Sequence, residues 1–195
     1  MENKHNSKKN KRKDKKSKEK KKVSSVDLLE KRVIYLTGEI DERLSKEVID
    51  KLMKLDMCNH KDITLYINSP GGEVREGLAI YDVMNMIKSD IKTICIGRCA
   101  SMASILLING TKGKRYILPN AEIMIHEVSS MCFGKLGEMQ DKVKHTERLN
   151  NKLYRIISKN TKQSFQEVKK MTHKKDNWMN AYEAIKYGFV DSILK

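Results

Sequence analysis

Three residues of this chain carry the side chains of a serine-hydrolase site. Ser101, His126 and Asp176 supply a hydroxyl, an imidazole and a carboxylate. A hydroxyl is a poor nucleophile until a hydrogen-bonded imidazole takes its proton, and the imidazole needs a carboxylate to fix its tautomer. If the fold brings the three side chains together, they predict nucleophilic attack on an acyl group.

Each of these residues also has a purely structural interpretation. Ser101 is placed where serine commonly caps a helix, and Asp176 would cap a helical stretch that we expect at residues 179–187. His126 would simply end a strand. Asp191 offers the histidine a second carboxylate, and the spacing leaves the choice between Asp176 and Asp191 open.

Short β-branched runs alternate with helical stretches from residue 33 onward, which predicts an α/β fold. The predicted strands are residues 33–36, 63–67, 91–96, 116–118, 122–125 and 189–193. The predicted helices are residues 45–55, 75–87, 101–108 and 138–158, followed by one shorter helix before the last strand. Ser101 therefore lies at a strand-to-helix junction.

Backbone N–H groups near this junction predict an oxyanion hole. A helix N-terminus presents unpaired N–H groups and a positive dipole, which favour a developing negative charge. Gly71 and Gly72 follow a predicted strand, and glycines let the backbone approach a ligand closely. We expect the N–H of one of these two glycines and that of Met102 to form the pair of donors.

Charge is concentrated at the N-terminus. Residues 1–22 carry 12 Lys or Arg and 3 acidic residues, a net charge of +9 out of +15 for the whole chain. Such a composition predicts a disordered, lysine-rich tail over residues 1–24 and one domain over residues 25–195. The tail is compatible with import, so we expect an organelle matrix, an apicoplast-like plastid in preference to a mitochondrion.

Membrane and nucleic-acid partners are not expected for the body of the chain. No apolar run is long enough to span a bilayer, and no apolar segment follows the basic run as it would in a secretory signal. A basic tail can touch nucleic acid, but that interpretation rests on residues 1–22 alone.

The four cysteines predict neither a metal site nor a disulfide scaffold. Cys58, Cys95, Cys99 and Cys132 form no C-x-x-C pair and have no histidines at zinc spacing. We expect reduced thiols, no metal and no cofactor. Cys99 precedes Ser101 by two residues, which would make the site sensitive to thiol reagents.

Six segments, in order, resemble the proteolytic subunit of the caseinolytic protease, the ClpP family, and the resemblance extends from residue 28 to residue 195. The segments are RVIYLTGE (32–39), DITLYINSPGG (62–72), GLAIYD (77–82), ASM (100–102), GKRYILPNAEIMIH (113–126) and AIKYGFVDSIL (184–194). The resemblance implies a spiral of ββα units, shared with the crotonases, and a projecting helical handle at residues 138–158.

The family's roles map onto the residues already singled out. The resemblance implies that Ser101 is the nucleophile, His126 the base and Asp176 the carboxylate, with Gly72 and Met102 as the oxyanion hole. It also implies a homo-oligomer, a heptameric ring that stacks into a tetradecamer. A hexameric AAA+ Clp ATPase would thread unfolded proteins or peptides into its chamber, where the chain acts as a serine endopeptidase.

The sequence departs from the family pattern in three places. Residues 127–134 read EVSSMCFG, where the family usually has Gln-Pro and a glycine-rich strand that pairs with substrate and leads into the contact between rings. Lys175 stands where an arginine is usual, and no axial hairpin is recognisable before Leu28. These differences bear on substrate pairing, ring stacking and pore gating.

Two alternatives come from other functional classes. One is a catalytically silent, structural subunit of a mixed ring, against which the complete set of Ser101, His126 and Asp176 argues. The other is a crotonase-like acyl-CoA enzyme on the same fold, which would share the paired backbone amides but usually relies on glutamates. Covalent labelling of Ser101 together with peptide cleavage would distinguish these alternatives.

Overall fold

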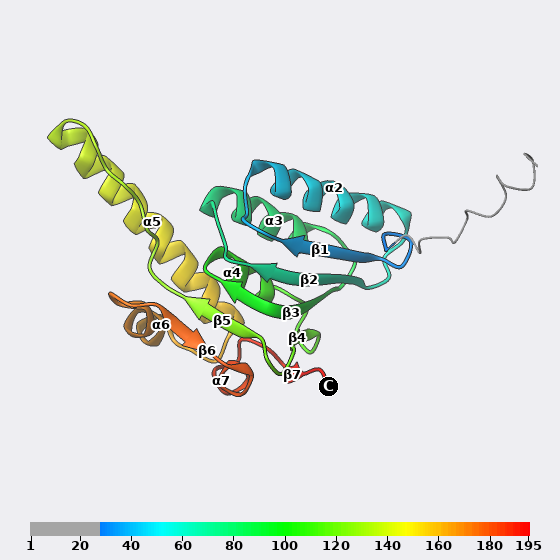
Figure 1. Ribbon diagram of the computed structural model, residues 1–195. Helices are drawn as coiled ribbons and strands as arrows, with labels where there is room; N and C mark the ends of the chain where they lie inside the picture. The colour runs from blue at the N-terminus through cyan, green and yellow to red at the C-terminus, as the bar shows by residue number, and fades with distance from the viewer. Residues whose placement is uncertain (1–27) are drawn as a thin grey trace, which may run out of the picture.

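Parallel strands form the centre of the structure. The computed structural model describes residues 28–195, so the predicted tail over residues 1–24 lies outside the described residues. Five strands lie side by side in the order β1 (Val33–Thr37), β2 (Ile63–Ser69), β3 (Ile91–Ala100), β4 (Arg115–Ile117) and β7 (Ser192–Ile193), all parallel (Figure 1). The predicted α/β class is confirmed.

The sheet divides along its longest strand. The first half of β3 pairs with β4, and its last three residues pair with β5 (Glu122–Ile125), which in turn pairs antiparallel with β6 (Asn177–Met179). Against β2, the register shifts between Cys95 and Cys99, so β3 contains extra residues there. This irregularity directs the end of β3 toward β5.

Helices cover one face of the sheet. In Figure 1, α2 (Glu42–Cys58) and α3 (Val74–Met86) lie over β1 and β2. Helix α4 (Met102–Ile108) follows β3 directly, and all seven of its residues are buried. A helix that is apolar all round must lie inside the core, so the element that begins after Ser101 is anchored on every side.

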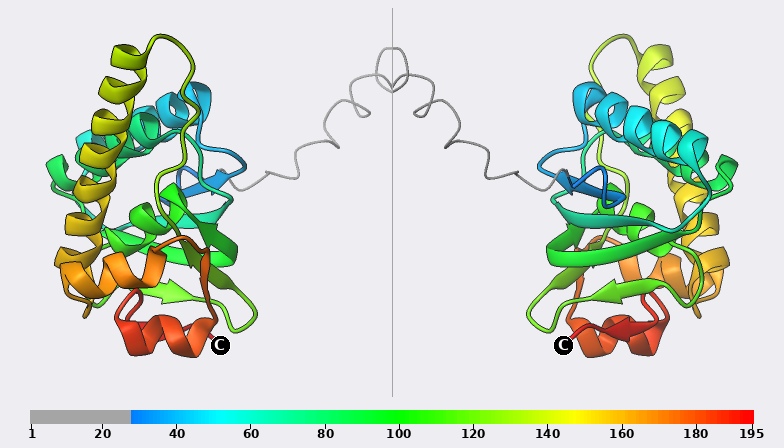
Figure 2. Two further views of the ribbon diagram at one scale, coloured as in Figure 1. Left: turned by 90° about the vertical axis from the view of Figure 1, so that its left-hand side faces the viewer. Right: turned by 90° about the vertical axis from the view of Figure 1, so that its right-hand side faces the viewer.

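Helix α5 (Leu136–Asn160) projects from the body as the handle, close to the predicted range of 138–158 (Figure 1). Its buried residues are Leu153, Tyr154 and Ile157, all in its C-terminal part. Helix α6 (Phe165–Thr172) packs against that part in both views of Figure 2. Among the described residues, no helix has the length and apolar composition that crossing a membrane requires.

The C-terminal part differs from the prediction. Two helices, α6 and α7 (Ala181–Tyr187), and the strand β6 occupy the region where we expected one shorter helix. The predicted strand 189–193 is a strand only at its end, because the N–H groups of Phe189 and Val190 bond to the carbonyl of Ala184 and finish α7. Phe189 and Val190 are buried at the end of α7. They are therefore apolar without being part of a sheet.

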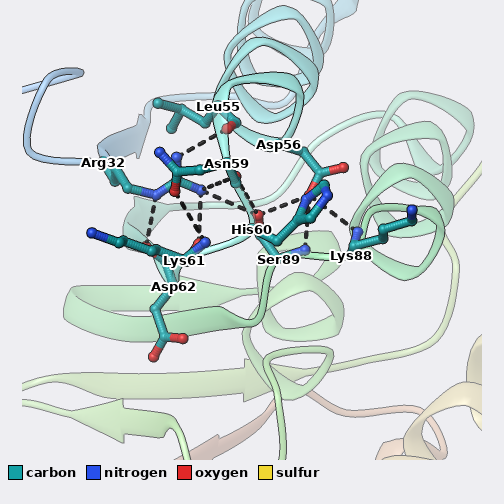
Figure 3. Close-up of polar contacts among 9 residues, drawn as sticks. All are labelled: Arg32, Leu55, Asp56, Asn59, His60, Lys61, Asp62, Lys88 and Ser89. Carbon is teal, nitrogen blue, oxygen red and sulfur yellow. Dashed lines mark hydrogen bonds and ion pairs between the residues drawn. The ribbon is translucent and has the colours of Figure 1, made fainter.

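Arg32 fixes the start of the described chain to the end of α2 (Figure 3). Its guanidinium group donates five hydrogen bonds, at 2.7–3.2 Å, to the carbonyls of Leu55, Asn59, Lys61 and Asp62 and to the hydroxyl of Ser89. The planar group of arginine can serve several acceptors at once. One side chain therefore joins β1, the C-terminus of α2 and the loop before β3.

Asp56 completes this cluster from the other side of Ser89. Its Oδ1 accepts hydrogen bonds from the N–H and hydroxyl of Ser89, both at 2.8 Å, and lies 3.2 Å from Nδ1 of His60. Partial burial alone would raise the pKa of Asp56, but the hydrogen bonds from Ser89 and the contact with His60 outweigh it and bring the pKa down to about 2. Asp56 is thus ionised throughout the neutral range.

Replacing Arg32 by lysine should destabilise the fold. An Arg32→Lys chain keeps the positive charge but cannot reach all five acceptors, so we expect the free energy of unfolding to fall by about 2 kcal/mol. Urea denaturation followed by circular dichroism measures this change. Lys31→Ala, at the exposed neighbouring position, is the control, and equal midpoints for the two variants would contradict the assigned role of Arg32.

Candidate active site

Ser101 lies at the strand-to-helix junction that the sequence predicted. Its backbone has φ 53° and ψ −123°, in the left-handed half of conformational space that residues other than glycine rarely adopt. The N–H of Ser101 donates to the carbonyl of Met124 on β5 at 2.8 Å. The residue occupies the N-cap position of α4, yet its side chain makes no capping hydrogen bond.

His126 lies next to the hydroxyl of Ser101. Its Nε2 lies 2.7 Å from Oγ of Ser101, a hydrogen-bond distance. The contact follows from the sheet, because Ala100 at the end of β3 pairs with Met124 on β5 and His126 comes directly after β5. The imidazole is therefore placed to take the proton of the hydroxyl.

Asp176 lies on the other side of the imidazole. One of its carboxylate oxygens, Oδ1, is 3.6 Å from Nδ1 of His126, within ion-pair range but longer than a hydrogen bond. The antiparallel pairing of Ile125 with Asn177 brings the two residues opposite each other. The alternative role as a helix cap is wrong, since α7 is capped by Asn180.

Asp191, the rival carboxylate, is bound elsewhere. It accepts hydrogen bonds from Nε and Nη2 of Arg115 at 3.1 and 2.7 Å, and from the backbone N–H groups of Gly113 and Arg115. Burial alone would raise the pKa of Asp191, but these hydrogen bonds and the charge of Arg115 leave it below its usual range. The structure thus brings Asp176, and not Asp191, to His126.

The two glycines after β2 are packed where no side chain fits. A Cβ atom on Gly71, whose φ is 94°, would lie 2.7 Å from the carbonyl oxygen of Ala100 and from Cβ of Ser101. One on Gly72, whose φ is 152°, would lie 2.3 Å from the carbonyl oxygen of Ile40. Backbone can therefore approach the hydroxyl closely only because both residues are glycine.

Two unpaired backbone donors border the same cavity as Ser101. Within residues 28–195, the N–H groups of Gly72 and Met102 have no hydrogen-bond acceptor. Both residues line this cavity together with Ser101 and His126. The arrangement can stabilise negative charge on an oxygen bound next to the hydroxyl.

Apolar side chains form one part of the remaining cavity wall. They belong to Val74, Ile105, Ile125, Val128, Leu153 and Ile157, and the polar residues Ser104, Glu127 and Ser129 line the rest. This wall could not be anticipated from the sequence near Ser101, because Leu153 and Ile157 come from α5, far along the chain. Their spacing of four residues on one helix face was the available signal. Such a wall suits an apolar side chain of a ligand.

Cys99 is not a reactive thiol in this structure. It is fully buried under the site, and burial, followed by its contact with Cys95, raises the pKa of the Cys99 thiol well above its usual range. The thiolate is the reactive form, so the expected sensitivity of the site to thiol reagents through Cys99 is not supported.

Comparisons with known proteins agree with the geometry. Residues 15–195 match the model of the Clp protease family. The ATP-dependent Clp protease proteolytic subunit of Carsonella ruddii (strain PV) is 43% identical to this chain over 167 residues. The similarity covers 86% of this chain and 86% of that bacterial protein.

Thiol labelling should separate the four cysteines into two classes. Cys58 is exposed and Cys132 half-buried, whereas Cys95 and Cys99 are buried. We expect iodoacetamide to modify the first two in the native protein within minutes, and all four only in denaturant. Mass spectrometry of the peptides measures this, and rapid native labelling of Cys99 would contradict its assigned burial.

Proposed function

Because the chain belongs to the Clp protease family, we propose that it works as the proteolytic subunit of an ATP-dependent Clp protease, a serine-type endopeptidase. The single observation that carries the proposal is the 2.7 Å contact between Nε2 of His126 and Oγ of Ser101. It is supported by the two unpaired backbone donors and the partly apolar cavity next to the hydroxyl.

The proposed reaction is acyl transfer through Ser101. Oγ of Ser101 attacks the peptide carbonyl carbon while His126 takes the hydroxyl proton, and the N–H groups of Gly72 and Met102 stabilise the oxyanion. The C–N bond then breaks as His126 gives its proton to the leaving amine. Water, deprotonated by His126, then attacks the acyl-enzyme ester. The ester C–O bond breaks as His126 returns the proton to Oγ of Ser101, which releases the acid and free Ser101.

Asp176 is the proposed orienting carboxylate. Its charge next to Nδ1 would hold the proton on that nitrogen, so that Nε2 faces Ser101 as the acceptor. In the single chain its side chain is 58% exposed and 3.6 Å from the ring. We propose that a neighbouring subunit covers this carboxylate and strengthens its contact with His126.

The proposed assembly is a heptameric ring, stacked into a tetradecamer, that works with a hexameric AAA+ Clp ATPase. The related protein is named as ATP-dependent, yet hydrolysis of a peptide bond by a serine needs no nucleotide. ATP would therefore serve unfolding and threading of protein substrates into a chamber. The projecting handle α5 supports stacking, because no residue of its outer part, 136–152, is buried in the single chain.

Neither alternative class is favoured. A silent ring subunit would have no use for a hydroxyl and an imidazole in hydrogen-bond contact. A crotonase-like acyl-CoA enzyme would use paired backbone amides, but the related protein is named as a protease. The cavity also contains a serine–histidine pair that such an enzyme does not need.

An organelle matrix remains the proposed location, plastid in preference to mitochondrion. It rests on the charge of residues 1–22 alone. Fluorescence microscopy of the tagged full chain in its own cells tests it, and a signal spread through the cytoplasm would contradict it.

Removing the proposed nucleophile or base should abolish peptidase activity. We expect Ser101→Ala and His126→Ala each to lower kcat/KM for a short fluorogenic peptide by about 10⁴-fold, because the two groups act as one unit. The assay is run on fractions separated by mass. Ser192→Ala, in β7, is the control, and activity that survives in Ser101→Ala would show that another group is the nucleophile.

The two carboxylates should behave differently when changed to amides. We expect Asp176→Asn to lower kcat by roughly 10³- to 10⁴-fold with unchanged stability, because the imidazole loses the charge that fixes its tautomer. Asp191→Asn leaves the buried guanidinium of Arg115 without its carboxylate, which should lower the free energy of unfolding by about 3 kcal/mol. Peptide kinetics and urea denaturation measure both effects. A loss of kcat in Asp191→Asn together with a loss of stability in Asp176→Asn would contradict the roles assigned to the two carboxylates.

A further inference from the structure

The segment that follows His126 is attached to the handle by polar side chains. After β5 the chain turns and runs along α5 (Figure 1). The N–H of Val128 donates to Oδ1 of Asn150 at 3.1 Å, and the hydroxyls of Ser130 and Thr146 are 3.1 Å apart. Thr146 and Asn150 are one helical turn apart on the same face of α5, so they hold the segment antiparallel to the helix.

This attachment leaves the backbone groups on either side of Val128 available to a ligand. Glu127, Val128 and Ser129 all line the cavity that Ser101 borders. The N–H of Val128 is bound by Asn150, whereas the backbone groups of Glu127 and Ser129 have no hydrogen-bond partner within the described part of the chain. These groups form an open edge beside the proposed nucleophile, to which an extended peptide can add as a strand.

The carboxylate of Glu127 is directed toward α6. Its Oε1 lies 3.5 Å from Nδ1 of His173, at the end of α6. Both residues line a groove that is formed mainly by polar residues, among them Asn150, Thr146 and Lys169. The negative charge is thereby kept on the side of the segment that faces α6.

Asn150 is needed because of a difference between this sequence and the pattern that it resembles. Position 128 corresponds to the proline of the usual Gln-Pro pair, and proline has no N–H. Val128 adds a half-buried donor, which is costly without an acceptor. Oδ1 of Asn150 supplies that acceptor.

We infer that Asn150 is a positioning residue: by binding the N–H of Val128, it keeps the edge formed by Glu127 and Ser129 open toward a peptide substrate. This inference rests on the proposed peptidase function. Asn150 touches no reacting atom and acts through the strand edge. Its loss should affect substrates long enough to pair with that edge and spare reagents that react with Ser101 alone.

The test compares a long and a minimal substrate. Steady-state kinetics use a fluorogenic hexapeptide, and Ser101 itself is titrated with diisopropyl fluorophosphate, which is too small to pair with a strand. We expect Asn150→Leu to lower kcat/KM for the hexapeptide by about tenfold, the effect of one hydrogen bond, mainly through KM. The rate of labelling by the fluorophosphate should change by less than about twofold, which is within the effect of a surface substitution.

Three variants make the result specific. Asn150→Asp keeps an acceptor oxygen and should retain hexapeptide activity. Asn151→Leu is the matched control, because Asn151 lies next to Asn150 in the same groove and its side chain makes no hydrogen bond within residues 28–195. Val128→Pro removes the donor itself, so adding Asn150→Leu to Val128→Pro should cause no further loss. The comparison of Val128→Pro with the double variant keeps the test decisive even if Asn150→Leu alone does not fold.

Other outcomes overturn the inference. Equal losses of hexapeptide cleavage and fluorophosphate labelling in Asn150→Leu would mean that the residue supports the whole site and not the strand edge. Full activity of Asn150→Leu, or a further loss in the Val128→Pro background, would also contradict it. An unmodified chain that neither cleaves the hexapeptide nor reacts at Ser101 would instead refute the proposed function.

Discussion

The parallel pairing of the last residues of β3 with β5 is the constraint on which the site depends. It sets Ala100 opposite Met124, so the residues that leave the two strands, Ser101 and His126, emerge side by side. The antiparallel strand β6 extends the same pairing and places Asp176 beside the imidazole. Backbone hydrogen bonds between strands thus bring together three side chains from separate parts of the sequence.

The backbone around Ser101 is held in a conformation that it would not adopt by itself. A left-handed serine costs free energy and persists only where its surroundings determine it. Here the buried helix α4 follows it, β5 binds its N–H, and Gly71 fills the space beside its Cβ. The same packing that enforces the strained turn also aims the hydroxyl at His126, so stability and reactivity have one structural origin.

Much of this arrangement could be predicted from the sequence, for identifiable reasons. The buried strands and the junction at Ser101 follow from local hydrophobic runs and small residues, which act over short distances. The choice between Asp176 and Asp191 could not be made from spacing and followed only from the resemblance, because it depends on the register of the three-residue strand β6 and on the ion pair of Asp191 with Arg115. The apolar run at Phe189 was misleading, because burial against a helix end and burial in a sheet require the same residues.

The outer part of the handle has consequences for the dynamics of the molecule. Residues 136–145 of α5 form helical hydrogen bonds, but none of these residues is buried. Helices without tertiary packing open at little cost in free energy. Amide protons there should therefore exchange with solvent rapidly in an isolated subunit, whereas those near Leu153 and Ile157 remain protected. Slow exchange along the whole helix would then report that the handle has found a partner.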